Sequence, residues 1–336
     1  MASKRWGAAL AAVAIALPFA ASPFTAQALE QAPLVLEARI PLGKVSGRID
    51  HLALDRARQR LFVAELGNDS LGIVDLKQRT LLRHISGLDE PSGVAYIASA
   101  DAVFVANAGD GSVRVWTGED FAPVGRIALK NDADNLRADQ ANGLVIAGFG
   151  SGALAVIDAK TRQTVRELPL KGHPEGFQLE PSGQRIFVNV PDAREVAVIA
   201  RASGLQIGAW KNPDAHANFP MAIRQDGTQV LVVYRSPAPR LAVFDTATGA
   251  ISSSLSTCND ADDVFVDEQR QRIYISCGDG MIDVLGFSGS DIKHIAQITT
   301  VSGARTSLYD PELDRLFLAV RASSGEPAAI WVYRPQ

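Results

Sequence analysis

Three features of the sequence predict an all-β fold, a seven-bladed β-propeller with four-stranded blades. A unit of about 42 residues recurs seven times, which is the length that four strands and their turns need in one blade. β-branched and other apolar residues alternate within each unit. Almost no segment has the 3.6-residue periodicity of a helix.

The repeat is clearest in the apolar second strand of each unit. Its seven copies are residues 61–63, 103–105, 144–146, 186–188, 231–233, 273–275 and 316–318. A third strand that ends on an aspartate follows, as in residues 72–75 and 154–158. This order of strands and short turns is the pattern of an antiparallel blade.

The seventh unit ends at its third strand, residues 330–333, and lacks a fourth. Residues 34–40 precede the first unit and resemble the fourth strands at 124–128 and 165–168. Because an unpaired sheet edge promotes aggregation, we expect the N-terminal strand to pair with the last blade and close the ring.

Residues 1–28 have the pattern of a signal peptide. Lys4 and Arg5 precede an apolar run over residues 7–21, and residues 26–28, Ala-Gln-Ala, fit the small-x-small cleavage rule. The run is shorter than the ~20 apolar residues of a membrane-spanning helix. The sequence therefore predicts a protein exported to the periplasm, with no membrane span and a mature chain that begins near Leu29.

The composition excludes two classes of protein. The chain has 33 Lys and Arg against 37 Asp and Glu, a net charge of −4 without a basic cluster, so a nucleic-acid partner is not expected. With 47% hydrophobic residues the chain is not disordered. Since no linker interrupts residues 29–336, we expect one propeller domain there, and a monomer.

The repeat resembles the YVTN-repeat, YncE-like β-propellers, whose unit has a Tyr-Val-x-Asn strand followed by Val-x-Val-Ile-Asp. Residues 104–107, Phe-Val-Ala-Asn, match the first motif, and residues 73–75 and 156–158 match the end of the second. The resemblance covers about residues 34–336. It implies a periplasmic propeller in a family that includes binding proteins and subunits of redox systems, with lactone-processing enzymes on related propellers.

The chain departs from the motif at the asparagine. Only Asn107 keeps it, and the equivalent positions are Glu65, Phe149, Val190, Arg235, Cys277 and Val320. No shared ligand is therefore implied by the resemblance.

Charged side chains recur in the turns before the first strands. The aligned turns contain Asp50, Asp134, Glu175, Asp262 and Arg305, with His51, Asn135 and Asp263 adjacent and His173, His216 and Asn218 close by. A propeller gathers these turns at one end of its channel, and small ligands favour concave sites with convergent polar groups. His84 and His294, on fourth strands, are expected to face solvent without a role.

Three interpretations of this ring remain open. Asp, Asn and His side chains cap tight turns in many proteins. Arg305 can neutralise the acids or bind an anionic ligand through its planar fork. Carboxylates of Asp50, Asp134, Glu175 and Asp262 could instead bind a divalent cation such as Ca²⁺, which takes oxygen ligands.

The predicted function is a non-catalytic binding or interaction protein that needs no cofactor. Its ligand would be a small molecule or a periplasmic protein at the acidic mouth of the channel. The alternative is a Ca²⁺-dependent hydrolase of the lactonase kind, in which His51 or His173 carries the proton. The sequence has no serine-hydrolase elbow, phosphate loop or Cys-x-x-Cys-His motif.

Two cysteines are predicted at the same end of blade 6. Cys258 lies in the turn before the blade's first strand, and Cys277 ends its second strand. In an oxidising compartment such a pair is expected to form a disulfide, although two thiols could also bind copper.

Overall fold

The computed structural model describes all residues except 5, 8–31, 182 and 324. The chain divides into two units, Met1–Gln31 and Ala32–Gln336. Most of the predicted signal peptide, residues 1–28, lies outside the described residues. Over the part of the chain that is described, no helix combines the length and apolar character needed to cross a membrane.

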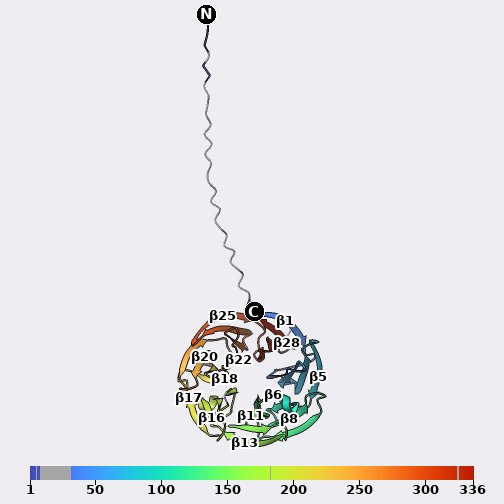
Figure 1. The fold of residues 1–336 in the computed structure, drawn as a ribbon. Helices are drawn as coiled ribbons and strands as arrows, with labels where there is room; N and C mark the ends of the chain where they lie inside the picture. The colour runs from blue at the N-terminus through green and yellow to red at the C-terminus, as the bar shows by residue number, and fades with distance from the viewer. Residues whose placement is uncertain (5, 8–31, 182, 324) are drawn as a thin grey trace. The chain divides into compact units, whose positions relative to one another are not determined.

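Ala32–Gln336 forms a ring of seven four-stranded antiparallel sheets, which confirms the predicted propeller (Figure 1). Blade 1 contains β2 (Leu52–Asp55), β3 (Arg60–Glu65), β4 (Ser70–Asp75) and β5 (Thr80–Ser86). Blade 2 contains β6 (Pro91–Ile97), β7 (Ala102–Asn107), β8 (Ser112–Thr117) and β9 (Pro123–Ala128). Blade 3 contains β10 (Ala133–Asp139), β11 (Leu144–Phe149), β12 (Ala153–Asp158) and β13 (Gln163–Pro169).

The second half of the ring repeats this order. Blade 4 contains β14 (Phe177–Leu179), β15 (Arg185–Val190), β16 (Glu195–Ala200) and β17 (Gln206–Trp210). Blade 5 contains β18 (His216–Ile223), β19 (Gln229–Ser236), β20 (Arg240–Asp245) and β21 (Ile251–Ser256). Blade 6 contains β22 (Ala261–Asp267), β23 (Arg272–Cys277), β24 (Met281–Ser288) and β25 (Asp291–Thr299). Short 3₁₀ turns occur at Leu66–Asn68, Ala98–Ala100 and Pro191–Ala193.

Blade 7 joins the two ends of the propeller. It contains β26 (Ser307–Asp310), β27 (Arg315–Val320), β28 (Ala329–Pro335) and the N-terminal strand β1 (Leu34–Pro41). Strand β1 pairs antiparallel with β28, from Leu34 opposite Pro335 to Pro41 opposite Ala329. The predicted closure by the N-terminal strand is therefore confirmed.

Aspartates fix the turn between the first and second strands of several blades. Asp55, Asp139, Asp267 and Asp310 each accept a hydrogen bond on Oδ1 from the backbone N–H three residues later. A side-chain acceptor in this position stabilises a tight turn without a regular backbone bond. These aspartates therefore stabilise the turns between first and second strands, which lie at the end of the channel opposite the mouth.

The propeller has no single core. Seven clusters of buried side chains each combine residues from two neighbouring blades, including blades 7 and 1. Phe62, Phe104, Phe187 and Phe244 are completely buried in these interfaces. Because every sheet is packed on both faces, the innermost strands are held firmly around the channel.

His84 on β5 does not simply face solvent, contrary to the prediction. Its Nδ1 lies 2.8 Å from Oε2 of the buried Glu65, and its Nε2 lies 3.1 Å from the carbonyl oxygen of Leu42. The half-buried ring therefore joins blade 1 to the segment that follows the closing strand. His294 on β25 is exposed, as expected.

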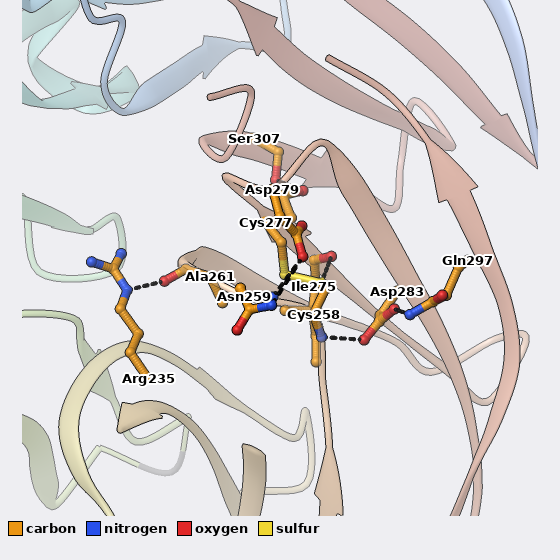
Figure 2. The surroundings of a disulfide bond; sticks show 11 residues. Arg235, Cys258, Asn259, Ala261, Ile275, Cys277, Asp279, Asp283, Gln297 and Ser307 are labelled. Atoms are coloured by element: carbon orange, nitrogen blue, oxygen red, sulfur yellow. Dashed lines mark hydrogen bonds between the residues drawn. A yellow bond between two sulfur atoms is a disulfide. The ribbon is translucent and has the colours of Figure 1, made fainter. Parts of the chain in front are cut away.

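The predicted disulfide is present in blade 6 (Figure 2). Cys258 and Cys277 are bonded, with their Cα atoms 5.9 Å apart. The backbone N–H of Cys258 also donates to Asp283, and that of Asn259 donates to Asp279. These contacts fix the turn that leads into β22.

Candidate ligand-binding channel

β-bulges turn polar side chains toward the channel mouth. The pairing register shifts at the start of four innermost strands, β6, β10, β18 and β22. In β10 the shift leaves Asp134 and Asn135 outside the ladder, and in β22 it does the same for Asp262. A bulge re-aims the side chain it contains, so these residues reach the mouth rather than the blade interfaces.

A network of ion pairs spans the mouth between blades 5, 6 and 7. Arg305 contacts Asp260 at 2.7 Å and, through Nε, Asp262 at 2.9 Å. Arg235 also pairs with both carboxylates, at 3.2 Å from Asp260. Its guanidinium lies over the ring of Phe219, with Cζ 4.1 Å from the centroid. Two arginines therefore share two carboxylates, which fixes all four side chains.

Arg48 extends the network to blade 1. Its Nη2 donates to Asp50 at 2.9 Å and lies 4.0 Å from Asp262. Asp50 is only 1% exposed, and its Oδ1 has no hydrogen-bond partner among the described residues. Burial raises the pKa of Asp50 to about 6. Keeping the Asp50 carboxylate ionised at the mouth therefore costs desolvation free energy.

Two histidines at the mouth are held in the protonated form. His51 Nδ1 lies 3.8 Å from Asp263, whose other oxygen accepts a hydrogen bond from the Ser307 N–H. Burial acts to lower the pKa of His51, but the charges of Asp50 and Asp263 outweigh it and raise the value to about 10.

His173 is the second of these histidines. Its Nδ1 lies 2.6 Å from the carbonyl oxygen of Gly150, and its Nε2 lies 3.8 Å from Asp134. The Asp134 carboxylate raises the pKa of His173 to about 9 against the opposing effect of burial. Neither histidine is therefore a free base at neutral pH.

Three of the four carboxylates predicted to bind Ca²⁺ line the same small cavity. Asp134, Glu175 and Asp262 line one small cavity of about 30 Å³, roughly the volume of one water molecule. Burial, followed by the charge of Asp134, raises the pKa of Glu175 to about 7. Asp50 and Asp262 are paired with arginines. Arginines therefore compensate Asp50 and Asp262, whereas Glu175 has no ion-pair partner among the described residues.

In the described part of the chain, three potential metal ligands come close together at one place, beside the disulfide. There, ligand atoms of Cys258, Cys277 and Asp279 lie within 4.8 Å of one another. Because both cysteines are in the disulfide, their sulfurs are not thiolate ligands.

Two predicted residues lie apart from the ring. Asn218 is buried and donates from Nδ2 to Asn189 and to the carbonyl oxygen of Glu195, in blade 4. His216 begins β18, opposite Ser236. Neither residue lines the mouth cavity or the channel cavity below it.

A larger cavity of about 460 Å³ runs along the channel below the mouth. Residues of all seven innermost strands line it. His51, Arg137, Met221 and Asp263 lie at its inner end, where they also border the mouth cavity. The opposite end is lined by the exposed residues Arg56, Gln140 and Pro311, so the cavity opens on the face away from the mouth.

Four charged residues of this region were not among the predicted site residues: Arg48, Arg137, Arg235 and Asp260. Arg48 lies in the connection from β1, the fourth strand of blade 7, to β2 of blade 1. Arg235 replaces the motif asparagine in blade 5, and that substitution was the one available signal for it. Asp260 precedes its strand, and Arg137 lies on an innermost strand where alternation does not show which side chains reach the channel.

Comparison with known proteins shows the fold and no more. No protein-family model matches the sequence, and no curated protein matches it. Among solved structures, a chain of Kuenenia stuttgartiensis hydrazine synthase is similar with a TM-score of 0.72 and 15% identity, over 86% of this chain and 97% of that one. A chain of a mitotic checkpoint complex is similar with a TM-score of 0.77 and 14% identity, over 96% and 98% of the two chains. The YVTN-repeat assignment stays a prediction from the motifs.

Proposed function

We propose that the protein is a non-catalytic binding protein that holds a small molecule in the central channel, against the inner side of the charged mouth. The observation that carries this proposal is the cavity of about 460 Å³ along the channel axis. Its volume lies in the range of about 300–1,000 Å³ that is typical of small-molecule sites. Its walls are strands packed on both faces, so the site is formed before the ligand arrives.

The charges at the mouth favour binding over metal-assisted hydrolysis. A lactonase needs a cation with open coordination positions and a group that accepts a proton. Here Asp50 and Asp262 are paired with arginines, and the pKa values of His51 and His173, raised to about 10 and about 9, keep both histidines protonated at neutral pH. The disulfide and the predicted leader support export to the periplasm, an oxidising compartment.

A bulky residue at the open end of the channel tests the proposal. Gln140 is exposed and lines the cavity there, so Gln140→Trp should cover the opening. The matched control is Ala141→Trp, because Ala141 is exposed in the next position but does not line the cavity. Native mass spectrometry of gently purified protein should show a small molecule bound to wild type and to Ala141→Trp, with occupancy at least tenfold lower in Gln140→Trp.

Thermal shift with a broad panel of small molecules gives the second measurement. Stabilisation by a ligand should be present in wild type and in Ala141→Trp and absent in Gln140→Trp. Equal binding by all three proteins would place the ligand outside the channel and contradict the proposal.

A further inference from the structure

Arg137 on β10 is the charged group that the mouth network leaves out. Its Nε donates to the carbonyl oxygen of Phe177 at 3.0 Å, and its Nη1 donates to the carbonyl oxygen of Leu136 at 2.8 Å and to Asn135 Oδ1 at 3.3 Å. All three acceptors are neutral. Among the described residues, Nη2 makes no hydrogen bond and no carboxylate oxygen lies within the 4.0 Å of an ion pair.

The other arginines of the channel differ in this respect. Arg48, Arg235 and Arg305 contact carboxylates at the mouth, and Arg56 at the open end contacts Asp310 at 2.6 Å. Burial lowers the pKa of Arg137, although the nearby charges of Asp263 and Asp134 act to raise it, so the guanidinium is poorly solvated and only partly compensated. A cation in this position is stabilised by an anion that approaches through the channel.

The surroundings of Arg137 define what such an anion looks like. Protonated His51 lines the same end of the cavity, with part of its charge balanced by Asp263. The walls below present polar and apolar surface in nearly equal parts, and the apolar part includes Leu52, Val94, Leu136, Met221 and Val264. A molecule with an apolar body gains free energy by covering this apolar part, which a hydrated inorganic ion does not.

We propose that the channel binds an organic anion, whose carboxylate accepts hydrogen bonds from Nη2 of Arg137 beside His51 while its apolar body fills the cavity toward Gln140. This inference rests on the proposed function and names the class of ligand. The planar guanidinium suits a carboxylate because it offers N–H groups in a fixed fork. Two of its sides are already held by Phe177 and Leu136, so the free side is oriented before binding.

Matched pairs of charged and neutral compounds test the ligand class. Hexanoate and benzoate are compared with hexanamide and benzamide, which have nearly the same shape, and inorganic phosphate is tested alone. Titration calorimetry at neutral pH should show each carboxylate binding to wild type at least tenfold more tightly than its amide, and phosphate more weakly than either carboxylate.

Variants then assign the effect to one residue. Arg137→Met should weaken the carboxylates at least tenfold and leave the amides unchanged, and Arg137→Lys should restore part of the difference. Arg162→Met, at an exposed turn of blade 3, is the control that should change nothing. The comparison of carboxylate with amide on wild type needs no variant, so a folding defect in Arg137→Met does not remove the test.

The outcomes separate the two proposals. Equal affinity for carboxylate and amide, or carboxylate affinity unchanged in both Arg137 variants, overturns the organic-anion inference and leaves the channel as a binding site. If phosphate binds as tightly as the carboxylates, the inference that the ligand has an apolar body is wrong. If no compound of either kind binds and purified protein carries no ligand, the proposed binding function itself is wrong.

Discussion

The channel mouth and the channel interior differ in whether their arginines form ion pairs with carboxylates. At the mouth, Arg48, Arg235 and Arg305 share carboxylates with one another, so their charges are neutralised within the protein. In the interior, Arg137 is held by neutral oxygens alone. The difference teaches that the number of charges in a region and their compensation are separate properties. Among the described residues, no carboxylate lies within ion-pair distance of Arg137, which is why we propose Arg137 as the group available to a ligand.

The largest expected effect comes from removing a carboxylate that the mouth arginines share. The Asp262 side chain is 12% exposed, whereas that of Asp260, which pairs with the same two arginines, is 43% exposed. Asp262→Ala should cost about 3–5 kcal/mol of unfolding free energy because it leaves cations unpaired in a partly dry site. Asp260→Ala, the matched control, should cost about 1 kcal/mol or less. Urea unfolding measures both, and equal losses would show that burial does not decide the strength of the network.

The disulfide holds the turn that leads into β22, because Cys258 lies just before the acidic residues at the start of that strand. The two cysteines are 19 residues apart. Replacing both with serine should lower the free energy of unfolding by about 3 kcal/mol, because the unfolded chain gains freedom. Urea unfolding of the double variant and of oxidised wild type checks this. A loss below about 1 kcal/mol would mean that the mouth network alone holds the turn.

Protonation of His51 makes the mouth sensitive to pH. Its folded pKa of about 10 lies above its usual value of 6.5, so its contribution is fully present below pH 6.5 and is lost as pH rises toward 10. Between pH 7 and 9, wild type should lose about 1 kcal/mol of stability per pH unit more than His51→Gln does. Parallel pH profiles from chemical denaturation of the two proteins would contradict the assignment.

The smallest expected effect is on the interior arginine. Arg137→Met removes three hydrogen bonds but also relieves a buried charge, so the loss of stability should be about 1 kcal/mol. Arg305→Met is the matched variant at the mouth, and should cost several times more because Asp262 and Asp260 each lose one of the two arginines that they share. If Arg137→Met proves the more damaging of the two in thermal and urea unfolding, Arg137 is structural and the contrast between the regions disappears.

The sequence was sufficient for the fold because the information is repeated seven times. The period sets the number of blades, and the missing fourth strand of the last unit requires β1 to close the ring. The cysteines could be paired because both fall at the same end of one blade. Each of these inferences needs only the order of strands.

The site was harder to predict because it depends on local departures from the repeat. The acids in the turns were found, yet Arg48, Arg235 and Arg137 were not, and these decide whether the ring binds a cation or is already neutral. The bulge in β10 that sets the direction of Asn135 is a register shift without a glycine or proline to announce it. The folded sheet therefore determines which side chains of an innermost strand reach the channel axis, and the sequence pattern alone does not predict them.

The pairing of β1 with β28 ties the order of synthesis to the order of assembly. Residue 34 lies opposite residue 335, so the ribosome must release almost the whole polypeptide before the circle can be completed. Until then the incomplete chain exposes an edge of its most recently formed blade and the unpaired strand β1. A truncation of only the final seven residues would remove β28 except for Ala329 and leave β1 and the neighbouring edge of β27 without most of their hydrogen-bond partners, and such a product should be an early target for proteases.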